Sequence, residues 1–82
     1  MEVRFDAAKD AINRAKHGIS LARAAELDVL AYIDDGRFSE PRFRLYGLIE
    51  GLAYCAAGTM RDGVIRIISL RRAHAKEMKR YV

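Results

Sequence analysis

The stretch Val64-Ile-Arg-Ile-Ile-Ser-Leu-Arg-Arg72 decides how the rest of this chain is interpreted. We predict a β-strand here, leading into a basic segment and a short helix. Arg66 stands inside an apolar run, where a guanidinium costs several kcal/mol unless it meets an anion or opens onto a groove. Strict alternation would place two sets of side chains on opposite sides: Ile65, Ile67, Ser69 and Arg71 on one, and Val64, Arg66, Ile68, Leu70 and Arg72 on the other.

The positive charge of the chain is concentrated at this end. Residues 61–82 carry seven basic and two acidic side chains, giving +5, whereas residues 1–60 carry eight basic and nine acidic ones, giving −1. The overall charge of +4 is therefore not a general property of the surface. Such a concentration predicts contact with a polyanion.

Length and composition set the class of protein. Eighty-two residues predict one domain, and 51% hydrophobic residues with one proline predict a folded chain. Apolar runs such as Val29–Ile33 are far shorter than the roughly 20 residues of a membrane span, and the first residues lack the apolar core of a signal peptide. The single cysteine, Cys55, excludes an intrachain disulfide. We expect a cytoplasmic location and no membrane contact.

The pattern of elements predicts an α+β fold in the order β-α-α-β-β-β-β-α. Asp6 and Ser20 are suited to cap two helices, the first ending before Gly18. Small apolar residues at helical spacing predict that both helices pack on one sheet face: Ala8, Ala11, Ile12 and Ala15 in the first, and Leu21, Ala24, Ala25 and Leu27 in the second. The other face is left for function. The predicted strands span residues 3–5, 29–33, 42–50, 52–60 and 64–72, with a turn at 34–37, a loop at 38–41 and a last helix at 75–81.

The sheet is predicted to be mostly antiparallel. Short turns at Glu50-Gly51 and Asp62-Gly63 join the last three strands into a meander, and the strand at 29–33 can join it at one edge. Alternation in the strand at 42–50 places Arg42, Arg44 and Tyr46 on the side opposite Phe43 and its apolar partners. That strand is therefore expected to have one buried face and one basic face.

Several candidate chemistries can be weighed from residue types. His17 and His74 are far apart and lie in no metal-binding pattern, so no metal or other cofactor is predicted. Cys55 lies in an apolar string and is expected to be buried. Lys16-His17-Gly18 closes the first helix, where two cations complement the helix dipole. The same residues could instead transfer protons at the edge of a basic groove, and the sequence leaves both interpretations open.

Arginines interleaved with tyrosines favour RNA as the polyanion. Guanidinium groups bind phosphate through paired hydrogen bonds, and aromatic rings stack on unpaired bases. The alternative is a solvated surface in which the arginines pair with acidic side chains such as Glu40 and Glu50. RNA also supplies its own nucleophile, the 2′-hydroxyl, so cleavage needs only a base, an acid and cations for the phosphorane. The chain contains these groups, but spacing does not assign their roles.

Several stretches together resemble the BrnT toxin family of bacterial type II toxin–antitoxin systems. The first half carries Arg4-Phe5-Asp6-x-x-Lys9, Asn13 and Lys16-His17-Gly18-Ile19-Ser20. The second half carries Glu40-Pro-Arg42 and Gly47, and then the string Arg66-Ile-Ile-Ser-x-Arg-Arg-Ala73 before a Glu77-x-x-x-Tyr81 helix, which is the most specific part. The strand at 52–60 is lighter, and the second helix richer in alanine, than the family pattern.

This resemblance implies that residues 1–82 form one ribonuclease toxin domain with a compact RelE-like fold. It implies RNA cleavage that inhibits translation. It also implies a BrnA-like ribbon-helix-helix antitoxin as partner, with contact to operator DNA only through that antitoxin. A higher-order toxin–antitoxin assembly is left open. A non-catalytic module that binds RNA or docks the antitoxin through the same face is the alternative. The catalytic residues implied are Lys16, His17, Arg66, Arg71, Glu77 and Tyr81, and the RNA-binding residues implied are Arg42, Ser69 and Arg72. The basic charge pattern adds Arg44, Lys76, Lys79 and Arg80 to the predicted RNA-binding residues.

Overall fold

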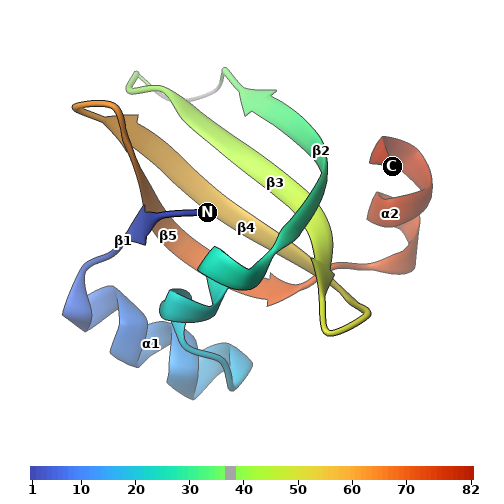
Figure 1. Ribbon diagram of the computed structural model, residues 1–82, viewed down its shortest axis with the longest axis horizontal. Coiled ribbons are helices and arrows are strands. Elements are labelled where there is room, and N and C mark those ends of the chain that lie inside the picture. The colour runs from blue at the N-terminus through green and yellow to red at the C-terminus, as the bar shows by residue number, and fades with distance from the viewer. Residues whose placement is uncertain (37–38) are drawn as a thin grey trace.

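The computed structural model describes residues 1–36 and 39–82, which form an α+β fold around one five-stranded sheet (Figure 1). The strand order is β1-β5-β4-β3-β2. Strands β3, β4 and β5 form the predicted antiparallel meander, β2 joins β3 at one edge, and β1 pairs with β5 in parallel. The strands are β1 (Val3–Arg4), β2 (Asp28–Asp35), β3 (Arg42–Ile49), β4 (Leu52–Arg61) and β5 (Val64–Arg72).

The helices begin and end close to the predicted positions. They are α1 (Ala7–His17), the 3-10 helix η1 (Leu21–Glu26) and α2 (Ala75–Tyr81). The Asp6 carboxylate accepts hydrogen bonds from the backbone of Ala8 and Lys9, and Gly18 ends α1 with φ of 71°. The predicted turn at 34–37 begins too early, because β2 continues through Asp35. Residues 37 and 38, which belong to that turn and to the loop after it, lie outside the described residues. None of the helices in the described ranges is long and apolar enough to cross a membrane.

Helix η1 covers one face of the sheet, which we call the core face. Leu21, Ala24 and Leu27 are buried there, whereas Ala25 is exposed, so its predicted inward position is wrong. The reason is geometric: a 3-10 helix has three residues per turn, so every third side chain points the same way. On the sheet side, the core is completed by Phe43, Leu45, Ile49, Ala56, Ile67 and Leu70.

Helix α1 runs beside β5 (Figure 1) and does not bury its alanine stripe. Ala8, Ala11, Ile12 and Ala15 are all exposed, Ile12 by 65%, so the predicted packing face is wrong. The buried residue of this helix is Asn13. Its side-chain amide donates to the carbonyls of Ile19 (2.9 Å) and Leu70 (2.8 Å), and its oxygen accepts from the Leu70 N–H (3.0 Å). Alanines bury little area, so these hydrogen bonds decide which side of α1 faces the sheet.

A β-bulge in β5 changes which side chains share a face. Ala57 of β4 pairs with Ser69 and Gly58 pairs with Ile67, so Ile68 is an extra residue without a partner in β4. Beyond the bulge the alternation is inverted. Leu70 therefore enters the core, while Ser69 and Arg71 join Arg66 on the opposite face, and the predicted strict alternation is wrong after Ile67.

Candidate functional site

The face of the sheet opposite the core gathers basic side chains from β3 and β5. Residues paired across neighbouring strands point to the same side. The register forms three rows on this side, Arg42–Thr59–Arg66, Arg44–Ala57–Ser69 and Tyr46–Cys55–Arg71. We call this surface the basic face. Its middle strand, β4, contributes the short side chains of Cys55, Ala57 and Thr59, so long cationic side chains flank a floor of small ones.

Arg72 does not belong to the basic face. It pairs with Tyr54, which packs against the hydrophobic core, and its guanidinium carbon lies 5.5 Å from the centre of the Tyr54 ring. Its Nε donates to the Ala53 carbonyl at 3.1 Å. Arg72, which is among the predicted RNA-binding residues, therefore lies on the side of the sheet opposite Arg71, as the alternation of neighbouring strand residues predicts.

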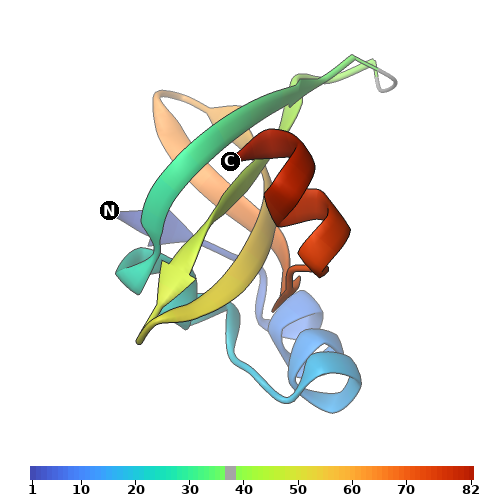
Figure 2. The same cartoon turned by 90° about the vertical axis from the view of Figure 1, so that its right-hand side faces the viewer.

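Helix α2 packs over one end of the basic face, on the side of the sheet away from η1 (Figure 2). Tyr81 stacks on the buried ring of Tyr46, with ring centres 5.1 Å apart. Glu77, one turn earlier on the same side of α2, points into the face. The rows that contain Arg44 and Arg42 lie progressively further along β3 from this contact.

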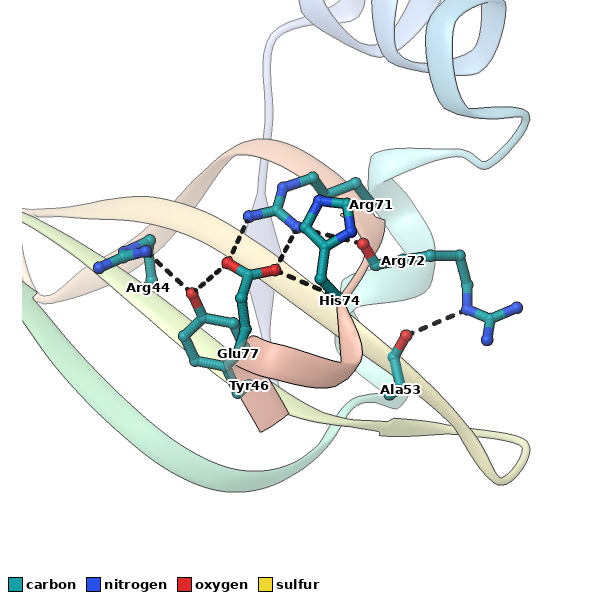
Figure 3. A network of polar contacts seen from close by, with 7 residues as sticks. All are labelled: Arg44, Tyr46, Ala53, Arg71, Arg72, His74 and Glu77. Atoms are coloured by element: carbon teal, nitrogen blue, oxygen red, sulfur yellow. Dashed lines mark hydrogen bonds and ion pairs between the residues drawn. The ribbon is translucent and has the colours of Figure 1, made fainter. Parts of the chain in front are cut away.

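The Glu77 carboxylate connects the polar groups under α2 (Figure 3). It accepts two hydrogen bonds from the Arg71 guanidinium, at 2.8 and 2.9 Å, and one from the Tyr46 hydroxyl at 2.8 Å. The backbone N–H of His74 donates a further one at 2.9 Å, which also caps the first turn of α2. Arg44 donates to the Tyr46 oxygen at 2.9 Å and completes the set. We call these residues, Arg44, Tyr46, Arg71 and Glu77, the Glu77 network.

These contacts fix the protonation states of the network. The hydrogen bonds from Arg71 lower the pKa of Glu77 well below its usual range, against the opposing effect of partial burial. The same contacts raise the pKa of Arg71, while burial and the bond to Glu77 raise that of Tyr46. Burial also raises the pKa of the Cys55 thiol, which is buried as expected. A carboxylate this strongly stabilised in its ionised form is poorly suited to carry a proton.

The second part of the site is a groove between α1 and β5, which we call the α1–β5 groove. It has a volume of about 250 Å³ and is lined by Lys9, Ile12, Asn13, Lys16, His17, Ile68 and Ser69. Ser69 belongs to the basic face, so the groove adjoins it. Lys9 and Lys16 are seven residues apart, which is two turns or about 10 Å along a helix. Lys9 also lines a hollow with Arg66, so the groove continues past the middle of β5.

The remaining predicted site residues lie at the margin. Lys76, Lys79 and Arg80 are exposed on α2, with the Arg80 guanidinium 5.3 Å from the Tyr81 ring centre. Of the acidic residues considered as partners, Glu26 and Glu50 pair with Arg23, and Glu40 lies 3.8 Å from Arg61. Within residues 1–36 and 39–82, no three His, Cys, Asp or Glu side chains are grouped as metal ligands.

Sequence reasoning missed three cations near Arg66. Lys9 lies on the groove side of α1, and its seven-residue spacing to Lys16 was the signal that could have found it. Arg4 pairs with Arg66 through the parallel β1–β5 register, and Arg61 reaches the same region from the end of β4. Arg4 has no local signal, because the pairing of β1 with β5 joins segments about 60 residues apart, whereas Arg61 lies near Arg66 through the short β4–β5 hairpin.

The fold and the site together define a small α+β protein with cationic side chains gathered on one face of its sheet. Residues 5–77 match the family model described as "Ribonuclease toxin, BrnT, of type II toxin-antitoxin system". The chain therefore belongs to the BrnT family of ribonuclease toxins, as the sequence resemblance predicts, and membership of a type II system implies an antitoxin partner.

A solved structure supports the fold independently. The crystal structure of the Brucella abortus ribonuclease toxin BrnT superposes with a TM-score of 0.70 at 22% sequence identity, covering 90% of this chain and 97% of that one. No curated protein matches the sequence.

Proposed function

We propose that this toxin is a metal-independent endoribonuclease that cleaves RNA and thereby inhibits translation. The observation that supports this most strongly is the convergence of cations from β3 and β5 around the small side chains of β4, with the cations of α1 in the adjoining groove beside β5. A phosphodiester lying over Ala57 would have arginines on both sides and the α1–β5 groove beside it. Such preorganised cations favour the extra negative charge of a phosphorane.

In this mechanism the substrate 2′-hydroxyl attacks the adjacent phosphorus, and the bond to the 5′-oxygen breaks. Arg66 and Arg42 would bind the non-bridging phosphate oxygens, and the Ser69 hydroxyl would donate to one of them. His17 and Lys16, exposed at the groove, would exchange protons with the attacking and leaving oxygens. Imidazole is the side chain best suited to proton transfer near neutral pH. We therefore assign His17 the removal of the proton from the attacking 2′-hydroxyl.

We assign the Glu77 network a positioning role. Glu77 and Tyr81 are proton-transfer candidates from the sequence, but the low pKa of Glu77 and the stacking of Tyr81 on Tyr46 favour a structural part instead. Glu77 would hold the Arg71 guanidinium at the border of the basic face through its two hydrogen bonds. The remaining N–H groups of Arg71 would then be available to bind a phosphate. Lys76, Lys79 and Arg80 would add long-range attraction for RNA.

The test is cleavage of a defined RNA in the presence of EDTA. The wild-type protein should produce new ends, and a substrate with 2′-deoxyribose at the cleaved position should resist, because it lacks the nucleophile. Arg66→Ala/Arg71→Ala should lower the cleavage rate by at least about 100-fold, as expected when charge stabilisation of a transition state is removed. Arg14→Ala, which removes a cation from α1 outside the groove, is the matched control. Equal rates for both variants and the wild type would refute the assignment.

A non-catalytic RNA-binding module is the alternative. It is favoured by one observation: Arg71 and Glu77 satisfy each other, so neither is poised to react with a substrate. RNA binding without new ends would support this alternative. An antitoxin-docking module is the third possibility. A complex of this chain with its antitoxin that persists at high salt and retains no RNA would support it.

For the partner we propose a BrnA-like antitoxin with a ribbon-helix-helix domain that contacts operator DNA, so that this chain reaches DNA only through the antitoxin. The antitoxin would cover the basic face with acidic or apolar segments. We further propose that residues 1–82 act as one RelE-like toxin domain in the cytoplasm. Co-purification with the product of the adjacent gene tests the partner directly, and the mass of the complex gives its stoichiometry.

A further inference from the structure

Three arginines from three strands line one small pocket at the end of the basic face. Arg4, Arg61 and Arg66 surround a cavity of about 80 Å³, together with Asp62 and Val64. Arg4 is the β1 partner of Arg66, and the Arg61–Val64 pair closes the β4–β5 hairpin. The pocket therefore brings three guanidinium groups together against one carboxylate.

This grouping is costly unless an anion occupies it. Like charges on neighbouring strands destabilise a sheet. The Glu40 carboxylate lies 3.8 Å from Arg61, but both side chains are more than half exposed, and such a pair contributes at most about 1 kcal/mol. Arg66 is half-buried, so its charge is less well solvated than those of Arg4 and Arg61. A phosphate group would bind three forked donors here at little cost to the existing contacts.

The pocket continues into the proposed reaction site. It shares Arg61 and Arg66 with a hollow that also contains Lys9 and Ile68, and that hollow shares Lys9 and Ile68 with the α1–β5 groove. The rows of Arg66 and Ser69 are two β4 residues apart, about 7 Å along a strand. This interval is close to one nucleotide of an extended RNA strand.

We propose that the pocket formed by Arg4, Arg61 and Arg66 is a second phosphate-binding subsite, which holds an RNA phosphate one or two nucleotides from the scissile one. This inference rests on the proposed RNA-cleaving function and extends it to a substrate of several nucleotides. Arg66 would then contact both phosphates or the link between them, while Arg4 and Arg61 serve the subsite alone.

The experiment measures binding of a 2′-O-methylated RNA octamer that cannot be cleaved. A set of octamers each carries one uncharged methylphosphonate at a different linkage. The wild-type protein should lose affinity at two or more linkages. Arg4→Gln should bind the fully charged octamer about tenfold more weakly than the wild type. At one of these linkages, methylphosphonate substitution should not weaken its binding further, because the contact between residue 4 and that phosphate is already lost. Arg4→Lys should restore part of the affinity, and Arg14→Gln should match the wild type.

The outcomes separate this inference from the proposed function. An unchanged linkage profile in Arg4→Gln, in a protein that cleaves ordinary RNA, overturns the subsite alone. A changed profile without cleavage of ordinary RNA supports the subsite and overturns the endoribonuclease. Failure of the wild-type protein to bind any octamer overturns both. Equal thermal unfolding temperatures of the variants and the wild type exclude misfolding as the cause of a loss.

Discussion

Glu77 holds together residues from three elements of this small protein. Its carboxylate bridges Arg71 of β5, Tyr46 of β3 and the backbone that begins α2. With 17% of its side chain exposed, it is partly shielded from water, so each of these bonds to a charged acceptor is stronger than a surface contact. The position of α2 on the basic face therefore depends on this ionised side chain together with the stacking of Tyr81 on Tyr46.

We expect Glu77→Gln to lower the free energy of unfolding by about 2 kcal/mol at pH 7, because a neutral amide cannot accept the paired bonds of Arg71. The pKa of Glu77 is lower in the folded protein than in the unfolded chain, where glutamate titrates near about 4.3. Its contribution is thus fully present above about pH 5 and is lost as the pH falls through the folded pKa.

Urea unfolding between pH 3 and pH 7 measures this effect. The difference in unfolding free energy between the wild type and Glu77→Gln should shrink as the pH falls. Glu2→Gln, at an exposed N-terminal position, should differ from the wild type by less than about 0.5 kcal/mol throughout. A constant difference across the pH range would contradict the assigned cause.

At the scale of elements, the sequence predicts where most strands and helices begin and end, because turns and caps are local. The Asp6 cap and Gly18 define α1, and the β4–β5 turn at Asp62-Gly63 uses positive φ at both residues. The orientation of α1 could not be predicted, since it depends on hydrogen bonds between Asn13 and Leu70, 57 residues later. The bulge at Ile68 was equally invisible, because an apolar residue there suits either register.

The small side chains of β4 are explained by how this strand pairs with β3 and β5. On the core side, the Phe43 ring covers Gly58, where a Cβ atom would lie 2.9 Å from the Arg66 carbonyl oxygen. On the other side, Ala57 leaves space between Arg44 and Ser69. The short side chains of β4 therefore serve close packing on one face and access for a ligand on the other.

Ala57→Leu should accordingly block the basic face without unfolding the protein. The added side chain projects between Arg44 and Ser69, where we place the phosphodiester. We expect RNA cleavage to fall by at least about tenfold, equivalent to roughly 1.4 kcal/mol, while the thermal midpoint changes by only a few degrees. Ala57→Ser, which keeps the space open, should retain the wild-type rate. Full activity of Ala57→Leu would show that the substrate lies elsewhere.

At the scale of the whole molecule, the charge is distributed unevenly. The sequence predicts this asymmetry from residue counts, and it predicts RNA from the pairing of arginines with tyrosines. The sequence does not reveal that Arg4, Lys9 and Arg61 lie beside Arg66. Their proximity depends on how β1, α1 and β4 are arranged around β5 in the folded protein. The paired acids Glu26 and Glu50 lie with Arg23 of η1, on the side of the core face.

This asymmetry predicts a steep dependence of RNA binding on salt. If Arg4, Lys9, Lys16, Arg42 and Arg66 together contact about five phosphates, log Kobs should fall against log salt with a slope of about −3.5. Raising the salt from about 50 to about 150 mM would then weaken binding by roughly 50-fold. Fluorescence anisotropy with the uncleavable octamer measures this slope. Arg23→Gln, on the core-face side, should leave the slope unchanged, whereas Lys9→Gln should reduce its magnitude by about 0.7. Identical slopes for these two variants would mean that RNA does not follow the α1–β5 groove.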